Sequence, residues 1–322
     1  MSMFDIRGRP MTLVYLDQCA VSSLLDQPRN ASWADVRETL LAGIRHRRLL
    51  CPYSLEHIVE TAAMPRDTVE TDMLLRRLSL GQSFRLEHRL IAAQINSILR
   101  DDSLPSPQDV LEPNRFRPLS DPSFRELALR RKRELDAYNV SKMELQNMMN
   151  AAFRDGRGPS PEIRRTILRL QHESYVKRFS SELEGVRKTG QVTPLTSPDR
   201  WPSAIISALV REYGFDMADL GQLESRIEAE GLLFVPFFKV KVVLEAAAKY
   251  KQQKIEPSDQ YDITRVACAL PFVDILVTDG GVAAELREAR LDTDFATEVF
   301  STKNAERAAL LRTLRNALDR TS

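Results

Sequence analysis

Two short apolar runs near opposite ends of the chain each stop on an aspartate. Leu13-Val-Tyr-Leu16 is followed at once by Asp17, and Ile275-Leu-Val-Thr278 is followed by Asp279. Runs of this length and composition predict buried strands. In an open α/β sheet, ligands bind beyond the carboxyl ends of the strands, so an acid at that place is well positioned for chemistry. If the two strands are neighbours in one parallel sheet, both carboxylates lie at the same mouth.

Such a pair of carboxylates has a physical consequence. Like charges held close together repel unless a cation or a proton lies between them. Asp279, which is followed directly by Gly280-Gly281, is the first candidate for a catalytic or metal-binding residue. For any single acid at a strand end or helix start, the ordinary alternative is a helix cap.

Two further elements carry acids toward the same predicted edge. Arg48 to Pro52 predicts a short second strand, and Ser54 is a good N-cap for a helix that carries Glu60. Asp259 and Asp262 stand at the start of the helix before the strand Ile275 to Thr278, with Asp262 as the candidate and Asp259 in reserve. The candidate ligands are therefore Asp17, Glu60, Asp259, Asp262 and Asp279.

Three neighbouring residues have other expected roles. Glu56 is expected to face solvent, and Asp274 is expected to be structural, as a cap or as a partner of an arginine. His57 is expected to be packed or partly exposed, and the alternative is a hydrogen bond to the metal-ligating residues or to the substrate. No histidine or cysteine set accompanies the acids, which favours Mg²⁺ or Mn²⁺ over zinc. Such ions bridge carboxylates to phosphate, so phosphodiester hydrolysis is the implied chemistry.

The middle of the chain has a different character. Helical periodicity replaces strand-like runs from about residue 65 to 234, which predicts an all-helical insertion in an α/β domain. The α/β domain is then expected to consist of residues 1–64 and 235–322.

The insertion is locally basic. From Arg115 to Lys188 there are 17 Lys and Arg against 10 Asp and Glu, although the net charge of the whole chain is only +1. These residues either form the solvated faces of long helices or face the phosphates of a nucleic acid. Long amphipathic helices also make self-association through the insertion an expectation.

The order of these motifs resembles that of the PIN-domain nucleases. The resemblance rests on Leu-Asp17 after the first strand, Glu60 on the helix after the second, Asp262 opening a helix, and Val-Thr-Asp279 closing a later strand. It covers roughly residues 12–64 and 235–302. It implies a central parallel sheet flanked by helices, one or two Mg²⁺ or Mn²⁺ ions held by the four acids, and cleavage of RNA or, less often, of DNA.

Two hypotheses follow for the function. The first is a divalent-metal-dependent endonuclease with RNA as the expected substrate and Asp17, Glu60, Asp262 and Asp279 as catalytic residues. The second is a PIN-like module that no longer cuts and binds nucleic acid or assembles through its helices. The chain has no run of about eighteen apolar residues, and its three cysteines lack any paired spacing. A cytoplasmic protein without a membrane partner is therefore expected.

Overall fold

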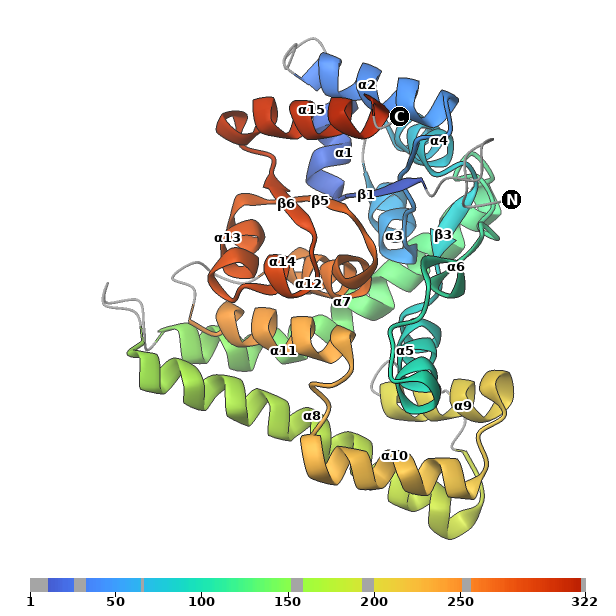
Figure 1. Cartoon of the computed structure of the whole chain (residues 1–322), viewed down its shortest axis with the longest axis vertical. Coiled ribbons are helices and arrows are strands. Elements are labelled where there is room, and N and C mark those ends of the chain that lie inside the picture. The colour runs from blue at the N-terminus through green and yellow to red at the C-terminus, as the bar shows by residue number, and fades with distance from the viewer. Residues whose placement is uncertain are drawn as a thin grey trace. The chain divides into compact units, whose positions relative to one another are not determined.

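The computed structural model describes residues 11–25, 33–64, 67–151, 159–192, 200–250 and 256–319. Most of these residues are helical, and a four-stranded parallel sheet is flanked by helices (Figure 1). The chain forms two compact units. The first consists of Met1–Phe84, Leu111–Arg133 and Ala269–Ser322, and the second of Arg85–Val110 and Glu134–Cys268.

The sheet lies in the first unit. Its strands are β1 (Thr12–Leu16), β2 (Leu49–Leu50), β5 (Ile275–Thr278) and β6 (Glu298–Ser301), in the order β2-β1-β5-β6, and each pair is parallel. The chain leaves β1 toward β2 on one side, whereas β5 and β6 lie on the other. The direction of winding therefore changes between β1 and β5, and this switch point is where open α/β sheets bind ligands.

Apolar stripes on the flanking helices bury the sheet. The helices of this unit are α1 (Gln18–Leu25), α2 (Ala34–Arg45), α3 (Leu55–Ala63), α4 (Thr68–Ser79), α13 (Gly280–Glu288), α14 (Leu291–Asp294) and α15 (Asn304–Asp319). Leu40 of α2 and Leu314 of α15 are fully buried in one core with Val14 and Val277 of the central strands. The buried positions on α2 recur every three or four residues, which is the periodicity of an amphipathic helix.

A glycine lets α2 approach the sheet closely. A Cβ atom at Gly43 would lie 2.5 Å from the side chain of Leu49 in β2 and 2.9 Å from that of Leu318. Leu49 is fully buried. A larger residue at position 43 would therefore force these side chains or α2 itself to shift away from β2, the edge strand beside β1.

The expected all-helical insertion contains two short strands, so that part of the prediction is wrong. β3 (Gln82–Phe84) and β4 (Leu111–Pro113) form an antiparallel pair in the first unit. Phe84 donates its backbone N–H to the carbonyl of Tyr53, which ties this small sheet to the loop before α3. Strands of three residues are too short to show the alternation that identifies a strand in a sequence.

The second unit is helical. It contains α5 (Glu87–Asp101), α6 (Pro107–Val110), α8 (Pro161–Thr189), α9 (Trp201–Tyr213), α10 (Met217–Glu230), α11 (Pro236–Ala248) and most of α12 (Pro257–Ala269). The helix α7 (Pro122–Ala151) begins in the first unit and ends in the second. These boundaries differ from those expected at residues 64 and 234, because α4 and β3 belong to the first unit and α11 to the second.

The core of the second unit combines aromatic rings with a buried charged network. Trp201 packs against Tyr175 and Phe238, with ring centroids 5.4 and 5.3 Å apart respectively. The Lys241 ammonium pairs with Glu87 at 3.1 Å and the Tyr175 hydroxyl donates to Glu245 at 2.9 Å. Every one of these contacts joins residues of the same unit, and they fix the mutual packing of α5, α8, α9 and α11.

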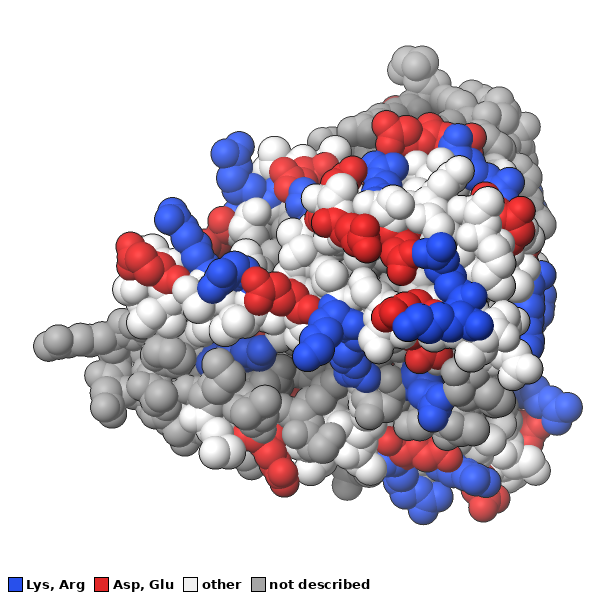
Figure 2. All heavy atoms as spheres, turned by 90° about the horizontal axis from the view of Figure 1, so that it is seen from below, with Lys and Arg blue, Asp and Glu red and all other residues white. Residues whose placement is uncertain are grey.

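The basic stretch is partly neutralised by neighbouring acids. Arg187 pairs with Glu224, and Lys188 pairs with Glu184 at 2.5 Å. Figure 2 shows Lys and Arg interspersed with Asp and Glu on the face seen from below, without a continuous positive patch among the coloured residues. Of the helices in the described part of the chain, none is long and apolar enough to cross a bilayer.

Candidate metal centre

Asp17 and Asp279 meet at the switch point of the sheet. β1 and β5 are adjacent, with Leu16 opposite Val277, and each strand is followed directly by its aspartate. One carboxylate oxygen of Asp17 and one of Asp279 lie within 4.8 Å of each other. The expectation that these two strands are parallel neighbours with their acids at one mouth is confirmed.

Hydrogen bonds from both sides of the strand pair fix Asp17. Its backbone N–H donates to the carbonyl of Val277 at 2.9 Å, which extends the pairing of β1 with β5 by one residue. The Thr278 hydroxyl donates to Oδ2 at 2.9 Å, and the Gln18 backbone N–H donates to Oδ1 at 2.5 Å. The residue is 1% exposed. An ionised carboxylate accepts several bonds at each oxygen, so both oxygens keep capacity for a cation.

Asp279 is the N-cap of α13. Its Oδ1 accepts hydrogen bonds from the backbone N–H groups of Gly281 at 2.6 Å and Val282 at 3.2 Å. The cap alternative considered for this residue is therefore correct, and it does not compete with a metal role. Within the described residues no donor is directed at Oδ2. The helix N-terminus orients one oxygen and leaves the other available beside Asp17.

His57 connects α3 to the end of β1. The ring is fully buried, Nε2 lies 2.8 Å from the carbonyl oxygen of Leu16, and Nδ1 lies 3.2 Å from the backbone nitrogen of Ser54. Because the Ser54 nitrogen is a donor, Nδ1 accepts and Nε2–H donates to Leu16. The expected packed histidine is thus confirmed, and it holds the residue that directly precedes Asp17. Ser54 caps α3 as expected.

Glu60 is half-buried on α3, one residue before Thr61. The neighbouring Gln18 side chain reaches the Thr61 hydroxyl at 3.5 Å, so α3 runs beside the start of α1. Among the described residues, the Glu60 carboxylate does not belong to a cluster of acids whose ligand atoms all lie within 4.8 Å. Its role as a ligand stays a prediction.

The two alternatives for the third ligand lie on α12 in the second unit. Asp259 accepts a hydrogen bond from the backbone N–H of Glu256 at 2.9 Å, which closes its own first turn. Asp262 forms an ion pair with Arg265, whose side chain is fully buried. Both acids are half-buried. Their ligand roles stay predictions from the sequence.

The remaining acids have local roles. The Asp274 carboxylate accepts the Leu13 backbone N–H at 2.7 Å, so this residue ties the start of β5 to β1 rather than capping a helix. Its expected structural role is confirmed. Glu56 lies half-buried in the first turn of α3.

Thr278 stands inside the Val-Thr-Asp segment but was not among the candidate site residues. Its fully buried hydroxyl orients Asp17 across the strand pair. The only sequence signal was a polar residue at the end of an apolar run, which also fits a strand end without function. Gln18 was likewise missed.

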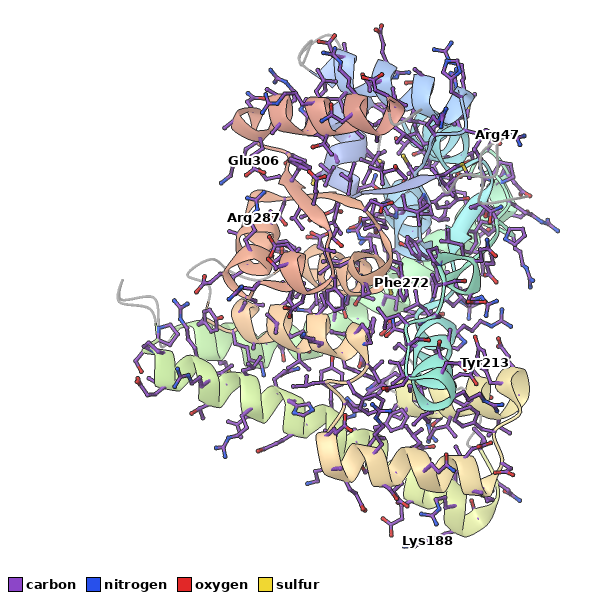
Figure 3. The ribbon with its side chains drawn as sticks, viewed as in Figure 1. Arg47, Lys188, Tyr213, Phe272, Arg287 and Glu306 are labelled. Carbon is purple, nitrogen blue, oxygen red and sulfur yellow. The ribbon has the colours of Figure 1, made fainter. Side chains whose placement is uncertain are left out.

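The loop between β6 and α15 is held next to this site by an ion pair. Arg287 of α13 makes a two-pronged pair with Glu306, with N–O distances of 2.9 and 2.6 Å (Figure 3). The Ser301 backbone N–H also donates to Glu306 at 2.8 Å. The hydrogen bonds from Arg287 lower the pKa of Glu306 from 4.5 to about 2.

We expect the Arg287–Glu306 pair to make stability depend on acid pH. Since the folded pKa of Glu306 lies below its ordinary value, the stabilisation is complete above about pH 4.5 and is lost as the pH falls toward 2. Both side chains are partly exposed, so screening limits the effect to about 1 kcal/mol. The free energies of urea unfolding of wild type and Glu306→Gln should differ by that amount at pH 6, and the difference should disappear as the pH falls through about 2. Glu38→Gln, at an exposed position on α2, is the matched control. A gap that widens at low pH would contradict this assignment.

No family model, curated protein or solved structure matches the chain significantly.

Proposed function

We propose that the protein is an endonuclease of the PIN-domain type that uses Mg²⁺ or Mn²⁺ to hydrolyse phosphodiester bonds in RNA. The observation that carries the proposal is the pair of carboxylates, Asp17 and Asp279, within 4.8 Å of each other at the ends of adjacent parallel strands. Two such anions beside a buried strand end favour a cation between them.

The chemistry of the donors fits a hard divalent ion. Asp17 and Asp279 offer carboxylate oxygens alone, and oxygen ligands suit Mg²⁺ or Mn²⁺ better than zinc. A divalent ion held there would neutralise charge on a substrate phosphate and supply an activated water. The protein's own part is to fix the ligands, through Thr278 and Gln18 for Asp17 and through the first turn of α13 for Asp279.

The proposal keeps the other two acids of the resemblance as ligands. Glu60 would contribute from α3, which His57 bonds to the end of β1. Asp262 would contribute from α12, with Asp259 as the alternative for the same place. A comparison of Asp262→Asn with Asp259→Asn would decide between them, because only the substitution that removes the true ligand should lower the affinity for Mn²⁺.

The test is cleavage of an oligoribonucleotide by the purified full chain. We expect a 5′-labelled oligoribonucleotide of mixed sequence to be cut internally with Mn²⁺ or Mg²⁺ and to stay intact with a chelator. The matching oligodeoxyribonucleotide measures the preference for RNA. If neither nucleic acid is cut with either ion, the nuclease proposal is wrong. Binding without cleavage would support the inactive-module hypothesis.

A further inference from the structure

A lysine side chain lies over the start of α13. A Cβ atom built on Gly280 would lie 2.4 Å from Cε and 3.0 Å from Nζ of Lys303. The backbone of Gly280 does not have a positive φ, so its conformation does not require glycine. Because Gly280 has no side chain, the Lys303 side chain has room to lie over the residue that directly follows Asp279.

The position of Lys303 is set by its own loop. On one side of it, the Thr302 backbone N–H donates to the carbonyl of Thr278 at 3.0 Å, which joins the loop to the end of β5. On the other side, the backbone N–H of Glu306 donates to the Lys303 carbonyl at 3.0 Å, while the Glu306 carboxylate pairs with Arg287. The loop is thus fastened to both β5 and α13, the two elements that flank Asp279.

The Lys303 ammonium lies at the start of α13, where the capping carboxylate of Asp279 meets the partial positive charge of the helix N-terminus. Within the described part of the chain, Lys303 makes no ion pair with a carboxylate. Its side chain is exposed, and an ammonium on a flexible stem is a common phosphate ligand.

We propose that Lys303 binds the phosphate of the RNA strand at the Asp17–Asp279 site and positions it for cleavage. The proposal rests on the nuclease function proposed above and adds a residue outside the four acids. Gly280 contributes by leaving the space through which the lysine reaches the site. The exposed ammonium supplies positive charge where the carboxylates alone would repel a phosphate.

The test compares variants of the full chain in the Mn²⁺-dependent cleavage of the labelled oligoribonucleotide. Lys303→Met should lower kcat/KM about 10- to 100-fold, the range for a lost hydrogen bond to a charged group. Lys303→Arg should retain most of the activity because the positive charge remains. Removal of one phosphate contact should also reduce the magnitude of the slope of log kcat/KM against log salt concentration by about 0.7.

Gly280→Ala provides an independent variant. The added methyl group should push the lysine tail aside and lower kcat/KM, by up to about 100-fold for a displacement of about 1 Å. Its stability should be unchanged or higher, since alanine is the better helix former. Arg312→Met, which removes an exposed charge from α15 nine residues further along the chain, is the control and should leave activity unchanged.

The outcomes separate this proposal from the nuclease function. If the wild type cuts and Asp279→Asn does not, but Lys303→Met is as active as the wild type, the lysine proposal alone is wrong. Equal losses in Lys303→Met and Lys303→Arg with an unchanged salt slope would assign a structural role and also overturn it. A wild type that cuts no RNA overturns both proposals.

Discussion

Replacing Asp279 by asparagine is expected to lower the Mn²⁺-dependent cleavage of RNA by about a thousand-fold or more, because a metal ligand contributes several kcal/mol to the transition state. The fold should survive the change. Asparagine caps helices as well as aspartate does, so the bonds to Gly281 and Val282 can be kept. Cleavage rate and Tm, measured on the same preparation, check both parts.

Asp35→Asn is the matched control for this variant. Asp35 is an exposed acid in the first turn of α2, in the same unit, and its neutralisation should leave cleavage unchanged. Asp279→Asn should also weaken the binding of Mn²⁺, whereas Asp35→Asn should not. Full activity in Asp279→Asn would remove this residue from the proposed site, whatever the other acids do.

Truncating His57 to alanine is expected to destabilise the first unit by about 3 kcal/mol, from the cavity and from the buried carbonyl of Leu16 left without its donor. His57→Gln, which can still donate a hydrogen bond, should cost less. Because Leu16 precedes Asp17, the alanine variant should also lose cleavage activity at temperatures where it remains folded.

Tryptophan fluorescence can isolate this effect. The chain has two tryptophans, Trp33 in the first unit and Trp201 in the second. In a Trp201→Phe background, the fully buried Trp33 reports on the unit that contains His57. His46→Ala, at an exposed position after α2, is the control and should leave the urea midpoint nearly unchanged. An equal midpoint for His57→Ala would show that the ring does not support the sheet.

The sequence was most informative where a strand or helix has a strong local signal. The apolar runs before Asp17 and Asp279 predicted two buried strands, and both are present at the expected places. Ser54 predicted the start of α3 because a hydroxyl at that position satisfies free backbone N–H groups. The meeting of Asp17 and Asp279 followed from one general rule of parallel sheets.

Features that depend on tertiary contacts could not be read in the same way. β3 and β4 are stabilised by pairing with each other, and their three residues carry no periodicity. The unit boundaries depend on which elements pack together. The sequence predicted that the α/β domain resumes at residue 235, but α11 belongs to the helical unit. Thr278 is placed by its hydrogen bond to Asp17, which is distant in the sequence. Lys303 is placed beside Gly280 by the fold of the intervening segment.

The central strand pair also constrains when the carboxylates can come together during synthesis. β1 lies between β2 and β5, and the hydrogen bond from Thr278 to Asp17 joins residues 261 positions apart. Contacts of such long sequence separation form late and slowly. While the chain is being made, β1 has only the two-residue β2 as a partner until β5 has left the ribosome. If the protein is the proposed nuclease, a nascent chain would therefore lack its paired carboxylates until translation has passed β5.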